Sequence, residues 1–164
     1  MKNEIIVIIH NIRSTHNVGS ILRTCDGFGV KSVIFSGYSP YPKLDDDDRL
    51  PHISAKLTKQ INKTSLGAEN FIKIIKSHDI FALLNELKSN RYVIVALEQY
   101  KNSINLKNYK PTEKIVLILG EEVNGIDKKL LDLTDVILEI PMHGQKESFN
   151  VSVAAGIALY SLTL

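Results

Sequence analysis

The 164-residue chain is 44% hydrophobic and 23% charged, which is the balance of a soluble globular protein long enough for one domain with a real core. Its single cysteine, Cys25, excludes an internal disulfide and fits a reducing cytoplasm, and its formal net charge of +2 neither indicates nor excludes a nucleic-acid partner. The apolar run at residues 5–9 is too short to span a membrane and lacks a signal-peptide cleavage site, so we expect a cytoplasmic protein without a membrane segment.

The first half of the chain alternates strand and helix patterns. Residues 15–28 are predicted to form a helix, because apolar residues recur at helical spacing, with Ser14 or Thr15 as the N-cap and Gly29 at its end. Residues 37–51 hold three prolines and four consecutive aspartates and are predicted to be a loop. The other segments are a continuous apolar strand at 5–9, a strand at 32–35 and a stretch without clear pattern at 52–70.

The second half continues this alternation. Ser77 is a candidate N-cap for a helix whose apolar residues lie between Ile80 and Leu87. The last helix, 149–162, is apolar nearly all round, which predicts cover on more than one side, the second side being covered by another subunit. The remaining elements are strands at 92–97, 115–119 and 136–140, a loop at 101–110 and a short helix at 126–133. The whole pattern predicts an α/β domain with a mainly parallel sheet of five or six strands flanked by helices.

Two segments carry polar residues suited to chemistry. In the first helix, Asn17, Ser20 and Arg23 recur every third residue within an arc of about 120°. Such a face suits a phosphate or a hydroxyl, and a solvated surface is the alternative. The second segment, residues 118–126, places two glutamates between glycines directly after a buried strand, where open α/β sheets bind ligands. An ordinary glycine-bounded turn is the alternative there.

A third segment, residues 140–157, combines a strand end, a polar loop and the start of a helix at Ser148 and Asn150. The first N–H groups of a helix are unpaired, so this geometry suits a ligand. The alternative is a core helix capped by Ser148, which does not explain the amide of Asn150 in the first turn. No glycine-rich dinucleotide fingerprint is present, and the histidines and Cys25 show no metal-ligand spacing, so we expect no metal site.

Together the three segments resemble the SpoU/TrmH family of RNA ribose 2′-O-methyltransferases, in the SPOUT superfamily. The resemblance spans residues 11–157, with the motifs in the expected order, and residues 63–69 and 96–98 resemble a short-chain branch of the family. Only Phe149 is larger than the apolar residue usual in relatives. The matching motifs are Asn17-x-Gly-x-x-x-Arg23, Leu119-Gly120-x-Glu122-x-x-Gly125, and Ile140-Pro-Met142 with Ser148-Phe-Asn150-Val-Ser152.

This resemblance implies an enzyme that transfers a methyl group from S-adenosylmethionine to a ribose 2′-hydroxyl of tRNA or rRNA. It implies a deep trefoil knot near the C-terminus, a rare exception among folds, and a homodimer that pairs through the C-terminal helix and the first-motif helix. Family members often add an N-terminal RNA-recruiting domain. Because this chain begins directly at its first strand, we expect a single SpoU-type domain at 1–164 without an appended RNA-binding domain.

The resemblance also assigns roles to residues. Arg23 would orient the 2′-hydroxyl and its phosphate or act as the base, and Asn17 would hold Arg23 or the ribose. Glu122 would support the second loop and position Arg23. Ser148 and Asn150 would shape the cleft for cofactor and substrate. The implied cofactor-binding residues, which act largely through backbone, are Leu97, Gly120, Ile140, Met142, Ser148 and Phe149.

Two other functions stay open on the same fold: a non-catalytic RNA-binding or ribosome-assembly protein, and a base methyltransferase of another SPOUT branch. The sequence does not name the RNA. We expect recognition by residues 38–65 and the first-motif helix. A candidate basic patch there is formed by Arg49, Lys56, Lys59 and Lys63, and an ordinary solvated surface is the alternative. The acidic run Asp45–Asp48 is an odd neighbour for RNA and has no explanation in the sequence.

Overall fold

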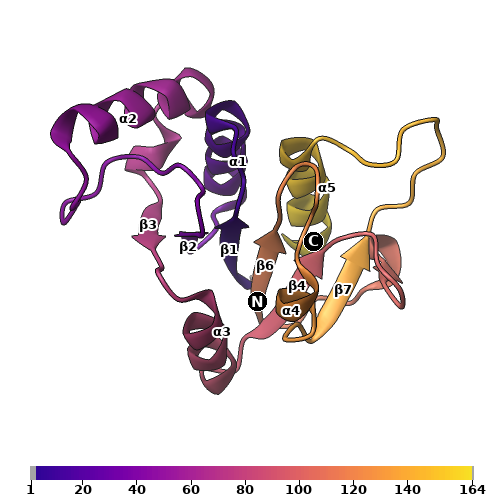
Figure 1. The fold of residues 1–164 in the computed structure, drawn as a ribbon. Coiled ribbons are helices and arrows are strands. Elements are labelled where there is room, and N and C mark those ends of the chain that lie inside the picture. The colour runs from indigo at the N-terminus through magenta and orange to yellow at the C-terminus, as the bar shows by residue number, and fades with distance from the viewer. Residues whose placement is uncertain (1–2, 164) are drawn as a thin grey trace.

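A computed structural model describes residues 3–163 of the chain, built around one seven-stranded sheet in which all paired strands are parallel (Figure 1). The strand order is β3-β2-β1-β6-β4-β7-β5. The α/β class and the parallel sheet are confirmed. The predicted count of five or six strands was wrong, because the two short edge strands were not recognised in the sequence. The strands are β1 (Glu4–His10), β2 (Ser32–Ser36), β3 (Lys73–Lys76), β4 (Val93–Leu97), β5 (Ile104–Asn105), β6 (Lys114–Leu119) and β7 (Val136–Glu139).

The helices are α1 (Thr15–Phe28), α2 (Pro51–Ser65), α3 (Ile80–Ser89), α4 (Lys128–Leu131) and α5 (Val151–Thr163), with 3₁₀ turns η1 (Ala68–Asn70) and η2 (Leu106–Asn108). α1 begins and ends as predicted: the Ser14 side chain accepts a hydrogen bond from Asn17 N, and Gly29 adopts φ 65°. The N-cap of α3 is Asp79 and not Ser77, because the Asp79 carboxylate accepts from two N–H groups of the first turn.

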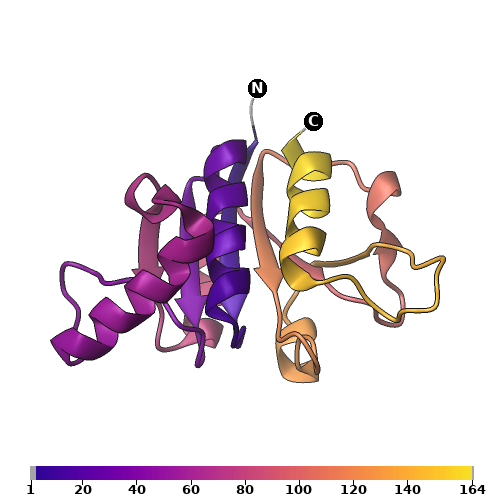
Figure 2. The ribbon, with the colours of Figure 1, turned by 90° about the horizontal axis from the view of Figure 1, so that it is seen from above.

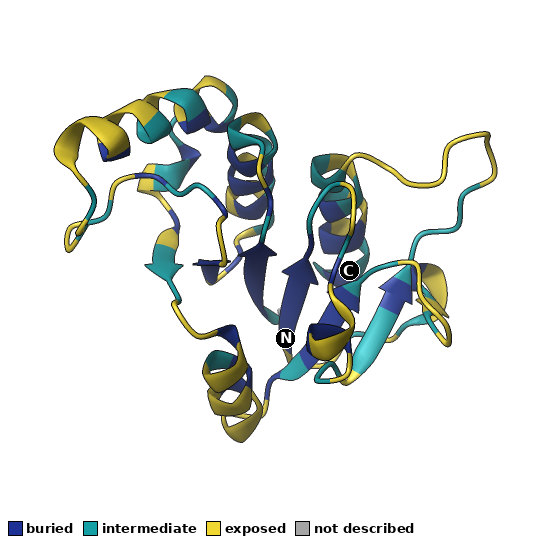
Figure 3. Ribbon diagram, viewed as in Figure 1, coloured by how far each residue is buried: buried dark blue, intermediate teal, exposed yellow. Residues whose placement is uncertain are grey.

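The sheet separates two hydrophobic cores, because successive side chains of a strand point to opposite faces. In β1, Val7 and Ile9 belong to the core under α1, α2 and α5, while Ile6 and Ile8 belong to the core under α3 and α4. Figure 2 shows α1 and α5 side by side on one face. The central strands β1 and β6 are buried after their first residues (Figure 3). Each fully buried Ile or Leu contributes about 1.5–3 kcal/mol, so the centre of the sheet anchors the molecule.

α5 is covered on one side only within this chain. Its small and branched residues Ala155, Ala158 and Leu159 are buried, whereas Val153 and Tyr160 are 51% and 58% exposed. Cover on one side of α5 is therefore confirmed. The other side presents apolar surface, and its cover by another subunit stays a prediction. None of the helices within residues 3–163 is long and apolar enough to cross a membrane.

The strand order determines where the loops of interest meet. β6, β4 and β7 are neighbours in the sheet and point the same way, so the loops after Leu119, Leu97 and Glu139 leave the same edge of the sheet side by side. Ligands of open α/β sheets bind at this kind of edge, beyond the carboxyl ends of the strands.

Candidate functional site

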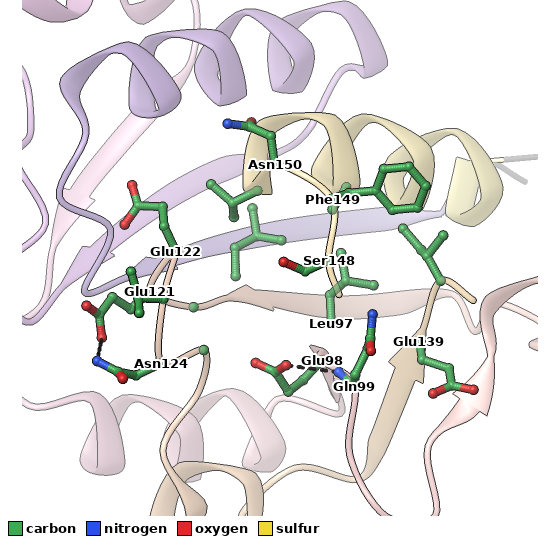
Figure 4. Close-up of a pocket in the computed structure, with 17 residues that line it drawn as sticks. Leu97, Glu98, Gln99, Glu121, Glu122, Asn124, Glu139, Ser148, Phe149 and Asn150 are labelled. Atoms are coloured by element: carbon green, nitrogen blue, oxygen red, sulfur yellow. Dashed lines mark hydrogen bonds between the residues drawn. The ribbon is translucent and has the colours of Figure 1, made fainter. Parts of the chain in front are cut away.

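A cavity of about 400 Å³ lies where these three loops meet the start of α5 (Figure 4). Its volume is within the range of small-molecule sites. Each wall comes from a different part of the chain: the loop after β4, the loop after β6, the end of β7 and the segment that leads into α5. The lining residues are Leu97, Glu98, Gln99, Leu119, Gly120, Glu121, Glu122, Val123, Asn124, Gly125, Glu139, Ile140, Ser148, Phe149, Asn150, Val151 and Ala154.

Most site residues named from the sequence lie in this cavity, and we call it the acidic cavity because its walls carry carboxylates. Gly120 allows its loop to fold tightly, since a Cβ there would lie 2.5 Å from Ile126 Cγ1. Three named residues are not in the lining: Asn17, which bonds to it, Met142, which is half-buried in the loop before α5, and Arg23. The named residues that line it are Leu97, Gly120, Glu122, Ile140, Ser148, Phe149 and Asn150.

Glu122 joins the acidic cavity to the start of α1. One carboxylate oxygen, Oε1, accepts hydrogen bonds from Ser14 N and Asn17 Nδ2, both at 3.1 Å, and Oε2 accepts from Arg13 N at 3.1 Å. These donors belong to the N-terminus of a helix, where a negative charge is also favoured by the helix dipole. Glu122 thus fixes the second-motif loop against the first-motif helix.

The hydrogen bonds set the charge of Glu122. Its partial burial raises the pKa of the carboxyl, but the donors from Arg13, Asn17 and Ser14 act in the opposite direction and leave the pKa below its ordinary value. Glu122 is therefore an ionised acceptor at neutral pH and an anchor for the helix start.

Two amides extend this link to α5. Asn150 Nδ2 donates to Asn17 Oδ1 at 3.1 Å, so Asn17 links Asn150 to Glu122 by hydrogen bonds on its two side-chain atoms. Asn150 Oδ1 accepts from Ser152 N and Ser152 Oγ, which makes Asn150 the N-cap of α5. The alternative interpretation, in which Ser148 caps this helix, is wrong in its choice of cap. Ser148 precedes the first turn and is exposed, whereas Asn150 accepts from the N–H of Ser152.

Arg23 lies apart from this network. Its side chain is exposed on α1, six residues beyond Asn17, which is about 9 Å along the helix axis. The carboxylate of Glu122 contacts the first turn of α1 and not Arg23, so any positioning of Arg23 by Glu122 acts through the helix.

Glu98 braces the cavity wall, a role that was not predicted from the sequence. Glu98 Oε2 accepts from Ile126 N, and Glu98 Oε1 accepts from Gln99 N, both at 2.9 Å, which holds the loop after β6 against the loop after β4. Gln99 Nε2 in turn donates to the carbonyl of Glu147 at 2.8 Å and ties down the segment before α5. The signal that could have identified Glu98 is its position as a polar residue directly after a buried strand.

The charge of the acidic cavity is one-sided. Four of its lining residues are glutamates, and no lysine, arginine or histidine is among the described lining residues. Figure 4 shows Glu98, Glu121 and Glu139 on three different segments around the cavity. A cavity with such walls favours a ligand that carries positive charge over a polyanion.

The fold and this cavity define an α/β protein with a cavity of small-molecule size at the carboxyl ends of parallel strands. A family model described as the SpoU rRNA Methylase family matches residues 49–160. The chain is 30% identical over 159 residues to a tRNA (guanosine(18)-2′-O)-methyltransferase of Aquifex aeolicus, covering 97% of this chain and 68% of that protein. It spans 57% of the length of Staphylococcus aureus TrmH-family relatives, to which it is also 30% identical over 96% of its own length. The chain therefore belongs to the SpoU/TrmH family of RNA methyltransferases.

Solved structures agree with this assignment. The crystal structure of the A. aeolicus TrmH/SpoU tRNA modifying enzyme superposes with a TM-score of 0.80 at 28% identity, covering 99% of this chain and 75% of that one. An AdoMet-bound rRNA methyltransferase from Sinorhizobium meliloti superposes with a TM-score of 0.75 at 21% identity, over 99% of this chain and 56% of that one, and shares the fold.

Proposed function

We propose that the chain is an S-adenosylmethionine-dependent methyltransferase that modifies a ribose 2′-hydroxyl of tRNA or rRNA. The observation that carries the proposal is the acidic cavity joined through Asn150, Asn17 and Glu122 to the helix that bears Arg23. When bound, S-adenosylmethionine supplies a methyl group on a positively charged sulfur. The cavity suits that charge because four lining residues are glutamates, of which only Glu121 has an ion pair within residues 3–163, with Arg13 outside the lining. The relatives support the proposal, since one is named as a 2′-O-methyltransferase and one fold neighbour is AdoMet-bound.

The residues divide the work between holding the cofactor and orienting the acceptor. Cofactor contacts come from Leu97, Gly120, Ile140, Met142, Ser148 and Phe149, largely through backbone groups. Arg23 orients the 2′-hydroxyl and its phosphate; as a guanidinium with a pKa above about 12, it serves as a fixed donor more readily than as a base. Asn17, Glu122 and Asn150 hold the helix that carries Arg23 against the cofactor loops.

The same proposal includes the assembly and the chain path. Residues 1–164 act as a single SpoU-type domain, the C-terminal segment forms the trefoil knot of the family, and two copies pair through α5 and α1. The exposed apolar side chains of α5, next to α1, support the pairing. The cytoplasmic location expected from the sequence goes with an RNA substrate.

The test is calorimetric titration with S-adenosylmethionine, followed by tritium-methyl transfer to total RNA from the source organism. We expect binding and incorporation of label into ribose. A substrate with 2′-deoxyribose at the target must then accept no methyl group, whereas continued methylation would point to a base methyltransferase. Absence of cofactor binding would overturn the proposal and favour a non-catalytic RNA-binding protein.

Arg23→Ala separates the two halves of the site. Because Arg23 lies outside the acidic cavity, the variant should bind S-adenosylmethionine as tightly as the unmodified protein, while methyl transfer falls by at least about 100-fold. Asp26→Ala, another exposed change on α1, is the control and should transfer methyl groups normally. A loss of cofactor affinity in Arg23→Ala would contradict the role given to Arg23.

A further inference from the structure

A second cavity, about 730 Å³ in volume, lies between the start of α1, the loop after β2 and α2. Its charge is opposite to that of the acidic cavity: three lining residues are cationic, and no described lining residue is acidic. We call it the basic groove. Its lining residues are Arg13, Ser14, Thr15, Gly37, Tyr38, Ser39, Pro40, Tyr41, Arg49, Leu57, Gln60 and Lys76.

Aromatic rings and cations alternate in the basic groove. Tyr38 is 53% exposed, and the Arg13 guanidinium lies 5.6 Å from the centre of its ring. The ring of Tyr41 has the Arg49 guanidinium 3.5 Å from its centre and Lys76 Nζ 5.4 Å from it. Proteins that bind single-stranded nucleic acids use aromatic faces next to cations, since the ring stacks on a base and the cation contacts a phosphate.

Arg49 builds the wall of the groove. Its guanidinium pairs with Asp47 and donates to the carbonyls of Tyr41 and Pro42 at 2.9 and 3.1 Å, so it pins the loop that carries both tyrosines. Asp47 also accepts from Leu44 N and Arg49 N. This explains one member of the acidic run, which organises the loop and does not face the groove.

Among the three cations of the groove, Lys76 would be stabilised most by a bound anion. Lys76 is half-buried at the end of β3, and its Nζ donates to the carbonyl of Gly37 at 2.7 Å. Burial first, and the nearby charge of Arg49 second, lower the pKa of Lys76. A phosphate at this position would offset both the lost hydration and the repulsion between the two cations.

The basic groove and the acidic cavity share one wall. Arg13 and Ser14 line the groove, and their N–H groups bond to Glu122, which lines the cavity. Arg13 also pairs through its guanidinium with Glu121 at 3.0 Å. An RNA strand whose reacting nucleotide lies at the mouth of the cavity can therefore extend into the groove.

We propose that the basic groove binds one unstacked nucleotide of the RNA strand that adjoins the methylated nucleotide, with its base on the ring of Tyr38 and its phosphate at Lys76. This inference rests on the proposed function and adds a substrate subsite to it. Stacking on tyrosine is tolerant of base identity, so the groove holds the strand in place without reading its sequence.

The test measures, by fluorescence anisotropy, how the 164-residue protein binds a fluorescein-labelled oligouridine of about 12 nucleotides. Tyr38→Leu should weaken binding by at least about fivefold, because it removes the stacking surface, while Tyr38→Phe should retain it. Lys76→Gln should lower the slope of log affinity against log salt by about 0.7, the value for one phosphate contact to a single strand. Lys73→Gln, an exposed change on the same strand and outside the groove, is the control.

The outcomes distinguish this inference from the proposed function. Unchanged oligouridine affinity and salt slope in Tyr38→Leu and Lys76→Gln, in a protein that binds S-adenosylmethionine and methylates RNA, would overturn the groove assignment alone. Weakened RNA binding in these variants, with cofactor affinity intact, would support it. A protein that binds oligouridine through Tyr38 but never binds S-adenosylmethionine would keep the nucleotide site and overturn the methyltransferase.

Discussion

Gly125 is the residue on which the wall of the acidic cavity depends most directly. Its backbone adopts φ +67°, where a side chain costs about 1–2 kcal/mol. An added Cβ would also lie 2.1 Å from Glu98 Oε2, and Glu98 is held by the N–H groups of Gln99 and Ile126. Gly125→Ala should therefore lower the free energy of unfolding by about 2–3 kcal/mol in urea titration and weaken cofactor binding.

Gly27→Ala is the matched control for this glycine. Gly27 lies within α1, and an added Cβ there meets nothing within 4 Å, so the change should raise the free energy of unfolding by about 0.5–1 kcal/mol. Equal stability of the two alanine variants would show that the loop after β6 has a different geometry.

His10 predicts how stability depends on pH. It is 7% exposed, and its Nε2 accepts from Asn11 Nδ2 at 3.1 Å while Nδ1 lies 2.8 Å from Ser36 Oγ, which suits the neutral ring. Burial lowers the pKa of His10 from its ordinary 6.5; Asp127, 3.8 Å away, opposes this shift, and Lys76 adds to it.

Because the folded pKa of His10 is the lower one, the unfolded chain takes up the proton first as pH falls. The contribution of His10 is complete above pH 6.5 and is lost as pH falls from there through the folded pKa. Urea unfolding at about pH 8 and about pH 5.5 should show this loss. His10→Gln should reduce the difference between the two pH values, and His52→Gln, which changes an exposed ring, should leave it unchanged.

At the scale of elements, burial decides which parts of the fold can be predicted from the sequence. β1 and β6 are buried on both faces, so their apolar runs marked them to within a residue or two. β5 has two residues and β3 has four, too few to show a period. α2 buries Ser54, Ile61 and Ser65, and this mixed set forms no apolar stripe, so the helix left no helical pattern in the sequence.

The candidate site, like the fold, could be predicted from the sequence only in part. The three motif segments could be located in the sequence because each is a local pattern at a strand end or a helix start. The hydrogen bonds that join them could not, because Asn17 and Glu122 are 105 residues apart and Asn17 and Asn150 are 133 residues apart. The capping role of Asn150 was not predicted either, and the alternative interpretation of this segment named Ser148 as the cap.

At the scale of the whole molecule, the outer face of α5 is where the proposed dimer pairs. Val153, Ile157 and Tyr160 are 51%, 38% and 58% exposed, an apolar surface that a second copy would cover. Ile157→Lys should convert the protein from dimer to monomer in sedimentation equilibrium, because a charge cannot be buried there without a partner. Phe71→Lys changes another exposed apolar residue, 80% exposed and outside α5, and should remain dimeric.

The monomeric variant should also separate cofactor binding from methyl transfer. The acidic cavity lies within one chain, so Ile157→Lys should keep its affinity for S-adenosylmethionine. Arg23 is exposed on α1, and its neighbour Thr24 lies at Gly156 of α5, where an added Cβ would be 3.8 Å from Thr24 Cγ2. A second copy on α5 would remove water from around Arg23 and strengthen the hold on the substrate phosphate that we propose for it. Methyl transfer should therefore fall when the dimer is lost. Full activity in a monomeric Ile157→Lys would show that one chain holds the complete site.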